Sequence, residues 1–127
     1  IEKFVFDPLQ NFQEKGPGNN YIRAFLEDDA GKMWIGTFGA GVSVYDPSSG
    51  KFTHYTRENS SLPSNYILDM EKDRMGNIYI GTSGDGLAVL KKGSPRFDNI
   101  TEKDGLPNGV INKILLNEEG NLWISTN

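Results

Sequence analysis

The stretch that decides the fold is DDAGKMWIGTFGAGVSVYD, residues 28–46, because its pattern recurs further along the chain. Two later stretches repeat it: KDRMGNIYIGTSGDGLAVL at residues 72–90 and NEEGNLWISTN at residues 117–127. Three turn glycines, spaced 45 and 44 residues apart, mark the period: Gly31, Gly76 and Gly120. The aromatic residues that follow them keep the same spacing: Trp34, Tyr79 and Trp123. One period shared by independent markers indicates a repeat architecture.

Each period predicts four short strands rather than a helix. The strands expected in the first period are residues 21–27, 33–37, 42–45 and 52–57. Gly, Asp, Pro and Ser fill the segments between them, where the chain must reverse direction. No stretch shows a sustained helical period. Four strands in roughly 40–50 residues is the signature of a β-propeller blade, so an all-β fold is expected.

The repeats also predict how the chain is divided. We expect residues 1–20 to end a preceding blade and form a connector, residues 21–65 and 66–109 to be complete blades, and residues 110–127 to begin another. This makes about two and a half four-stranded blades of a larger, seven-bladed propeller. Because propellers close with roughly four to eight blades, the expected partners of this segment are the rest of its propeller or other copies of the chain.

Composition and charge exclude several kinds of function. The net charge is −4 and no basic stripe is present, so nucleic-acid binding is not expected. Cysteine is absent, which excludes disulfides and thiolate metal sites. The acids Asp69, Glu71 and Asp73 imitate part of a calcium loop, but its twelfth position is Ile80. With His54 as the single histidine, expected to be solvent-exposed, we predict no catalytic residues, no metal and no cofactor in this segment.

The string GKMWIGTFGAGVSVYD, followed by KFTHYT and LPSNYI, resembles the two-component regulator propeller repeat. The resemblance covers essentially the whole chain, with Ser125 in place of a repeat glycine. It implies the periplasmic sensor region of a bacterial hybrid two-component sensor histidine kinase, a membrane-anchored and dimeric parent protein. It also implies that the ligand of the parent protein is an oligosaccharide or another small molecule and that this segment signals without being an enzyme.

Candidate ligand-binding residues follow from propeller geometry. The loops that enter each blade and the turns between its second and third strands are expected to share one face, and amides, carboxylates and aromatic rings there suit sugar hydroxyls and rings. The candidates are Asn20, Tyr21, Phe38, Asn65, Tyr66, Asp85 and Asn108. Position by position, an ordinary turn role remains the alternative. For Trp34, Tyr79 and Trp123 we expect packing between blades.

Two other functions stay open. Streptogramin lyases have related Gly-Trp repeats and use a histidine with metal-bound carboxylates, which blades outside this segment could supply. A propeller that binds another protein on its flat face is the second alternative, and no sequence feature excludes it.

Overall fold

The computed structural model describes residues 21–126 of the chain, which form three antiparallel sheets. The first sheet has its strands in chain order: β1 (Tyr21–Glu27), β2 (Met33–Phe38), β3 (Val42–Asp46) and β4 (Lys51–Tyr55). The second sheet repeats that order: β5 (Ile67–Lys72), β6 (Ile78–Thr82), β7 (Leu87–Leu90) and β8 (Asp98–Ile100). The 3-10 helix η1 (Glu102–Asp104) then leads to a third, two-stranded sheet: β9 (Ile111–Leu116) and β10 (Leu122–Thr126).

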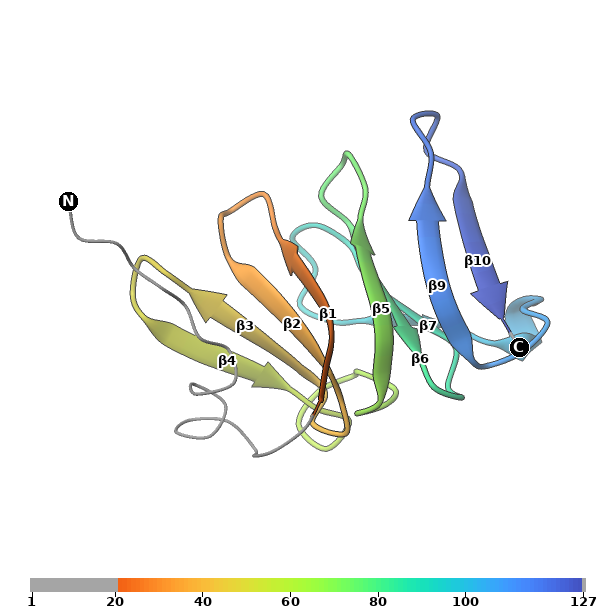
Figure 1. Ribbon diagram of the computed structural model, residues 1–127, viewed down its shortest axis with the longest axis horizontal. Helices are drawn as coiled ribbons and strands as arrows, with labels where there is room; N and C mark the ends of the chain where they lie inside the picture. The colour runs from red at the N-terminus through yellow and green to blue at the C-terminus, as the bar shows by residue number, and fades with distance from the viewer. Residues whose placement is uncertain (1–20, 127) are drawn as a thin grey trace.

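The sheets lie side by side like the blades of a fan, with β1, β5 and β9 as their first strands (Figure 1). The predicted all-β propeller segment is therefore confirmed. The predictions for residues 1–20, Asn20 included, lie outside the described residues. The exact blade boundaries and the seven-bladed parent stay predictions.

Two local features differ from the sequence expectation. The strand expected at residues 52–57 ends at Tyr55, because the Asn59 amide donates to the His54 carbonyl and accepts from the Thr56 N–H, which turns the chain. The helix η1 was not expected. Its Thr101 cap accepts a hydrogen bond from Lys103 N, and the turn ends at Gly105, whose φ is 107°.

Each first strand carries one extra residue opposite its partner. The register shifts between Ile22 and Ala24 in β1 and between Ile67 and Asp69 in β5, and it shifts at the same repeat position in β9. The residues at this β-bulge are Arg23, Leu68 and Asn112. A bulge re-aims the side chain that it carries, so these three positions differ from their strand neighbours.

The main core lies between the first two sheets. Trp34 is 5% exposed and belongs to a buried cluster that joins Val44 of the first sheet to Ile67 and Ile80 of the second. Its ring stacks on Tyr55 at 6.0 Å, with an interplanar angle of 8°. The expected packing of Trp34 between blades is confirmed. Tyr79 is only partly buried, and Trp123 is 63% exposed on the third sheet.

Two glycines allow neighbouring sheets to approach this closely. A Cβ at Gly36 would lie 2.7 Å from Cγ2 of Ile67, and one at Gly81 would lie 2.8 Å from Cγ2 of Ile111. The repeated Ile-Gly-Thr of the second strand therefore leaves room for the isoleucine of the next first strand. The close packing is therefore sufficient reason for a glycine at this position, and no unusual backbone angle needs to be invoked.

Candidate functional site

Loops from successive repeats meet at one end of the sheets, which we call the entry end (turns 38–41 and 83–86 with loops 62–66 and 106–110). The N–H groups of Gly39 and Gly41 both donate to the carbonyl of Asn65 at 2.9 Å. The same pair of bonds recurs one repeat later, from Gly84 and Gly86 to Gly109. The entry end is thus held by main-chain hydrogen bonds, which leave its side chains to vary between repeats.

At the first sheet boundary the entry end carries an aromatic cluster with one cation. Phe38 and Tyr66 bridge adjacent sheets and meet edge to face, their ring centroids 4.9 Å apart. Tyr21 lies directly opposite Phe38 in the β1–β2 register, so the two side chains share one face. The Arg23 guanidinium lies 5.8 Å from the Phe38 ring centroid. We call Tyr21, Arg23, Phe38 and Tyr66 the aromatic junction.

The rings of the aromatic junction are accessible. Tyr21 is 78% exposed, Tyr66 is 49% exposed and Phe38 is partly buried. At the next sheet boundary, Ser83 and Val110 form the equivalent bridge, without rings. The aromatic junction is therefore a local departure from the repeat rather than a part of it.

The remaining candidates fall into two groups. Asp85 is exposed at the entry end, in the turn of the second sheet. The amide of Asn65 is instead engaged within the protein: it accepts from Arg57 N and donates to Glu58 Oε1, both at 2.8 Å. Asn108 accepts from Val110 N at 2.8 Å, which caps its own turn. The structure favours turn-forming roles for both asparagines and leaves Tyr21, Phe38, Tyr66 and Asp85 as surface groups.

Sequence reasoning missed Arg23. The sequence does distinguish this position, because the equivalent residues of the other two repeats are Leu68 and Asn112, neither of which is charged. Its bulge position and its contact with Phe38 become apparent only from the register of β1 and β2.

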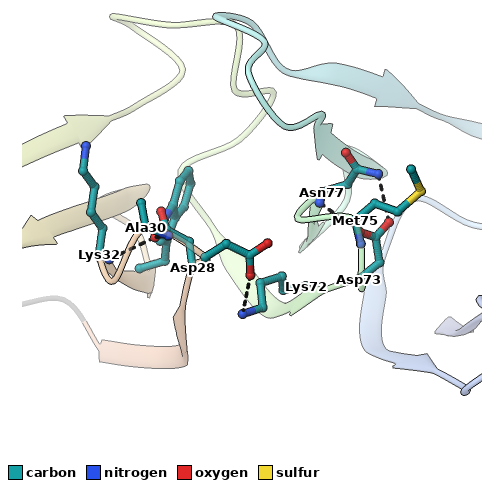
Figure 2. Close-up of polar contacts among 9 residues, drawn as sticks. Asp28, Ala30, Lys32, Lys72, Asp73, Met75 and Asn77 are labelled. Atoms are coloured by element: carbon teal, nitrogen blue, oxygen red, sulfur yellow. Dashed lines mark hydrogen bonds and ion pairs between the residues drawn. The ribbon is translucent and has the colours of Figure 1, made fainter.

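The opposite end of the sheets is built from aspartate turns (Figure 2). Asp28 accepts from the N–H groups of Ala30 and Lys32 and from Trp34 Nε1, the last at 2.8 Å. Asp73 repeats this arrangement and accepts from the Tyr79 hydroxyl at 3.0 Å. These carboxylates fix the turn and the following aromatic side chain together, so they have a structural role.

Electrostatics at Asp73 follow from these bonds. Partial burial acts to raise the pKa of the Asp73 carboxyl, but hydrogen bonds from Asn77, Tyr79 and Met75 outweigh it and hold the pKa below its ordinary value. Burial, together with the Asp73 hydrogen bond and charge, raises the pKa of the Tyr79 hydroxyl. One ion pair joins the first two sheets here, Lys72 Nζ to Asp29 Oδ1 at 3.1 Å (Figure 2). It is partly exposed, and such pairs contribute about 0–1 kcal/mol.

His54 differs from the exposed residue that was expected. It is partly buried in β4, with Nδ1 2.7 Å from the hydroxyl of Ser43 in β3. A Ser–His pair therefore exists, but Ser43 is fully buried and no substrate can reach its oxygen. An open groove of about 680 Å³ lies beside His54, between β4, the loop at residues 58–61 and the segment around Arg96.

Across residues 21–126, no three His, Asp or Glu side chains lie close enough together to hold a metal ion. Within the same residues, no helix has the length and apolar character needed to cross a membrane. The expectation of no cofactor stays a prediction.

Comparison with known proteins places these features in context. The sequence profile described as "two component regulator propeller" matches three segments: residues 16–39, 61–84 and 105–127. No match to the sequence of a curated protein is found.

Solved structures with the same fold include extracellular domains of bacterial signalling systems. One is described as that of the hybrid two component system BT3049 from B. thetaiotaomicron: 31% identity, TM-score 0.75, covering 84% of this chain and 14% of that one. Another, from BT4673 of the same organism, has 28% identity and a TM-score of 0.66 and covers 81% and 15%. Virginiamycin B lyase from Staphylococcus aureus, at 18% identity and TM-score 0.61 over 82% and 34%, shares the fold alone.

Proposed function

The chain belongs to the two component regulator propeller family, and from that premise we propose that it is a ligand-sensing segment of a hybrid two-component sensor. In this proposal the parent protein detects an oligosaccharide in the periplasm and signals to a histidine kinase. The chain is similar to the extracellular domains of such systems but spans only 14–15% of their length, so the function concerns the whole parent protein.

The observation that carries the proposal is the aromatic junction at the entry end. Tyr21 and Tyr66 present exposed rings with hydroxyl groups, and Phe38 adds an apolar surface between them. Rings of this kind pack against the apolar faces of sugars, while hydroxyl and carboxylate groups such as Asp85 bind sugar hydroxyls. Exposed apolar side chains that lie together in one patch are characteristic of binding surfaces.

The geometry also offers a way to transmit binding. Phe38 belongs to the first sheet, and Tyr66 lies beside the first strand of the second, so a ligand on both rings contacts two blades at once. A ligand shifts a conformational equilibrium only when it binds one state more tightly than the other. A sugar that fits one spacing of Phe38 and Tyr66 meets that requirement, and no bond in the ligand needs to be broken.

The experiment measures oligosaccharide binding to the intact extracytoplasmic region of the parent protein and ligand-dependent phosphorylation in the full-length sensor. We expect Tyr66→Ala to weaken binding roughly 2- to 13-fold, since an aromatic ring contact contributes about 0.5–1.5 kcal/mol. Met75→Ala is the control, because Met75 is a large exposed side chain, 76% exposed against 49% for Tyr66, but lies in the β5–β6 turn at the opposite end. Unchanged binding and signalling in Tyr66→Ala would contradict the assignment of this site.

A further inference from the structure

The repeats provide an internal comparison that separates packing residues from functional ones. In the two four-stranded sheets, positions that pack one sheet against the next keep their residue type, as Gly36 and Gly81 do, and the third repeat carries a residue that is still small, Ser125. At the bulge the three repeats instead carry a cation, an apolar residue and an amide: Arg23, Leu68 and Asn112. The fold therefore does not require an arginine at position 23, and its presence within the aromatic junction needs another reason.

Arg23 has no ionic partner within the described residues. The ion pairs of residues 21–126 all involve lysines, and none includes Arg23. Of the two acids in β5, Asp69 is already engaged: its Oδ2 accepts from Ile114 N at 2.8 Å and lies 4.0 Å from Lys113 Nζ. Arg23 is exposed and contacts the face of the Phe38 ring. A contact of this kind leaves the planar N–H donors of the guanidinium available for an incoming anion.

The placement of Arg23 suits a charged sugar. The cation–π contact with Phe38 restrains the guanidinium beside the rings, which lowers the entropy lost when it binds. Arg binds carboxylate and sulfate groups through two parallel hydrogen bonds. A ring surface and an anion-binding fork side by side match a sugar that carries an acidic substituent.

We propose that Arg23, Phe38 and Tyr66 form a subsite for an acidic sugar residue, whose carboxylate or sulfate pairs with Arg23 while its ring packs on the aromatic side chains. This inference rests on the proposed function and adds the chemical class of the ligand. Asp85, an exposed carboxylate at the neighbouring turn, can accept hydrogen bonds from sugar hydroxyls but would repel the anion.

The test compares acidic oligosaccharides with neutral counterparts of the same skeleton. The probes are trigalacturonic acid with its methyl ester, for a carboxylate, and a sulfated carrageenan tetrasaccharide with its desulfated form, for a sulfate. Each probe is titrated into the intact extracytoplasmic region of the parent protein, and its affinity is measured by calorimetry. We expect one acidic probe to bind at least tenfold more tightly than its neutral form, and its affinity to fall with added salt.

Variants then assign the preference to Arg23. Arg23→Gln should weaken the acidic probe about tenfold or more and leave its neutral form within twofold, whereas Arg23→Lys should retain part of the affinity. Arg74→Gln is the matched control, because Arg74 is an exposed arginine in the β5–β6 turn at the opposite end. Thermal melts of each variant check that folding is unchanged.

The outcomes separate this inference from the proposed function. If neutral probes bind as well as acidic ones and Tyr66→Ala weakens that binding, the acidic subsite is wrong and sugar sensing stands. Acidic binding that Arg23→Gln leaves unchanged likewise overturns the subsite. If none of the probes binds, the acidic subsite is wrong, and the proposed function fails only if the binding and phosphorylation experiment above is negative as well.

Discussion

The turn aspartates have a structural role that the sequence pattern does not reveal. The aspartate of the β5–β6 turn closes the turn through Met75 N and Asn77 N and also receives the Tyr79 hydroxyl. In the first repeat Asp28 does the same for Trp34. The sequence marks these turns by their glycines, but the carboxylate determines how turn and aromatic side chain are joined.

The lowered pKa of Asp73 leads to a pH prediction. Because its folded pKa lies below the ordinary value of 3.8, the charged carboxylate stabilises the fold above that pH. The contribution is lost as the pH falls through the folded pKa. Asp73→Asn should therefore lower the free energy of unfolding at pH 7 by about 1–3 kcal/mol, and the difference from wild type should shrink toward pH 2.

Chemical denaturation of the intact protein between pH 2 and pH 7 measures this difference. Asp98→Asn serves as the control, since Asp98 is exposed and its ion pair with Lys91 is long, at 4.0 Å. The assignment would be wrong if the curves of Asp73→Asn and wild type ran parallel throughout the acid range.

The candidate site was only partly predictable from residue types. Tyr21, Phe38 and Tyr66 were found because the loops that carry them recur at a fixed place in each repeat. The engagement of Asn65 with Arg57 and Glu58 could not be foreseen, because it depends on how the loop folds back on β4.

Strands are the scale at which sequence reasoning succeeded best. Turn residues flank each apolar segment and so mark where each strand begins and ends. Because the pattern repeats, each predicted strand boundary can be compared with the equivalent boundary in the next repeat. The exceptions have local causes: Asn59 shortens β4, and the Thr101 cap creates η1. The bulge in each first strand could not be read from the sequence, since an extra residue on one strand has meaning only against its partner.

Packing of β2 on β5 gives a prediction at the level of elements. A Cβ at Gly36 would meet Cγ2 of Ile67 at 2.7 Å, so Gly36→Ala should destabilise the protein by about 1–3 kcal/mol through overpacking. In an Ile67→Ala background the same change should cost at least about 1 kcal/mol less, because the obstructing methyl group is gone. Unfolding free energies of the four proteins in this double-mutant cycle measure the coupling.

Gly81 is the control for that cycle. Its added Cβ would lie 2.8 Å from the carbonyl oxygen of Ile111 as well as from its side chain. Truncating Ile111 cannot move this oxygen, so Gly81→Ala should stay costly in an Ile111→Ala background. Equal relief at both glycines would show that main-chain contact does not limit the approach of the sheets.

At the scale of the whole molecule, the sheets behave as neighbours in a linear array. Buried residues of the first and second sheets form one cluster, and a second cluster joins β7 to β9 through Leu87, Val89, Ile111 and Ile114. Each sheet therefore covers an apolar face of the next, as in other repeat proteins. The sequence predicted this linear arrangement of sheets, because each repeat places the same kinds of residue where one sheet packs on the next.

Shared cores predict that the first two sheets open together. Ile35 in β2 is fully buried yet belongs to neither cluster, so Ile35→Val weakens the first sheet without touching the second. The substitution should cost about 0.5–1.5 kcal/mol. If the sheets unfold as one unit, amides of β6 lose the same protection as those of β2, and their hydrogen exchange becomes roughly 2- to 13-fold faster. Exchange followed by mass spectrometry in the intact protein resolves the two strands. Faster exchange confined to β1–β4 would show that the shared cluster does not couple the blades, and ligand binding across Phe38 and Tyr66 would then have no cooperative unit to shift.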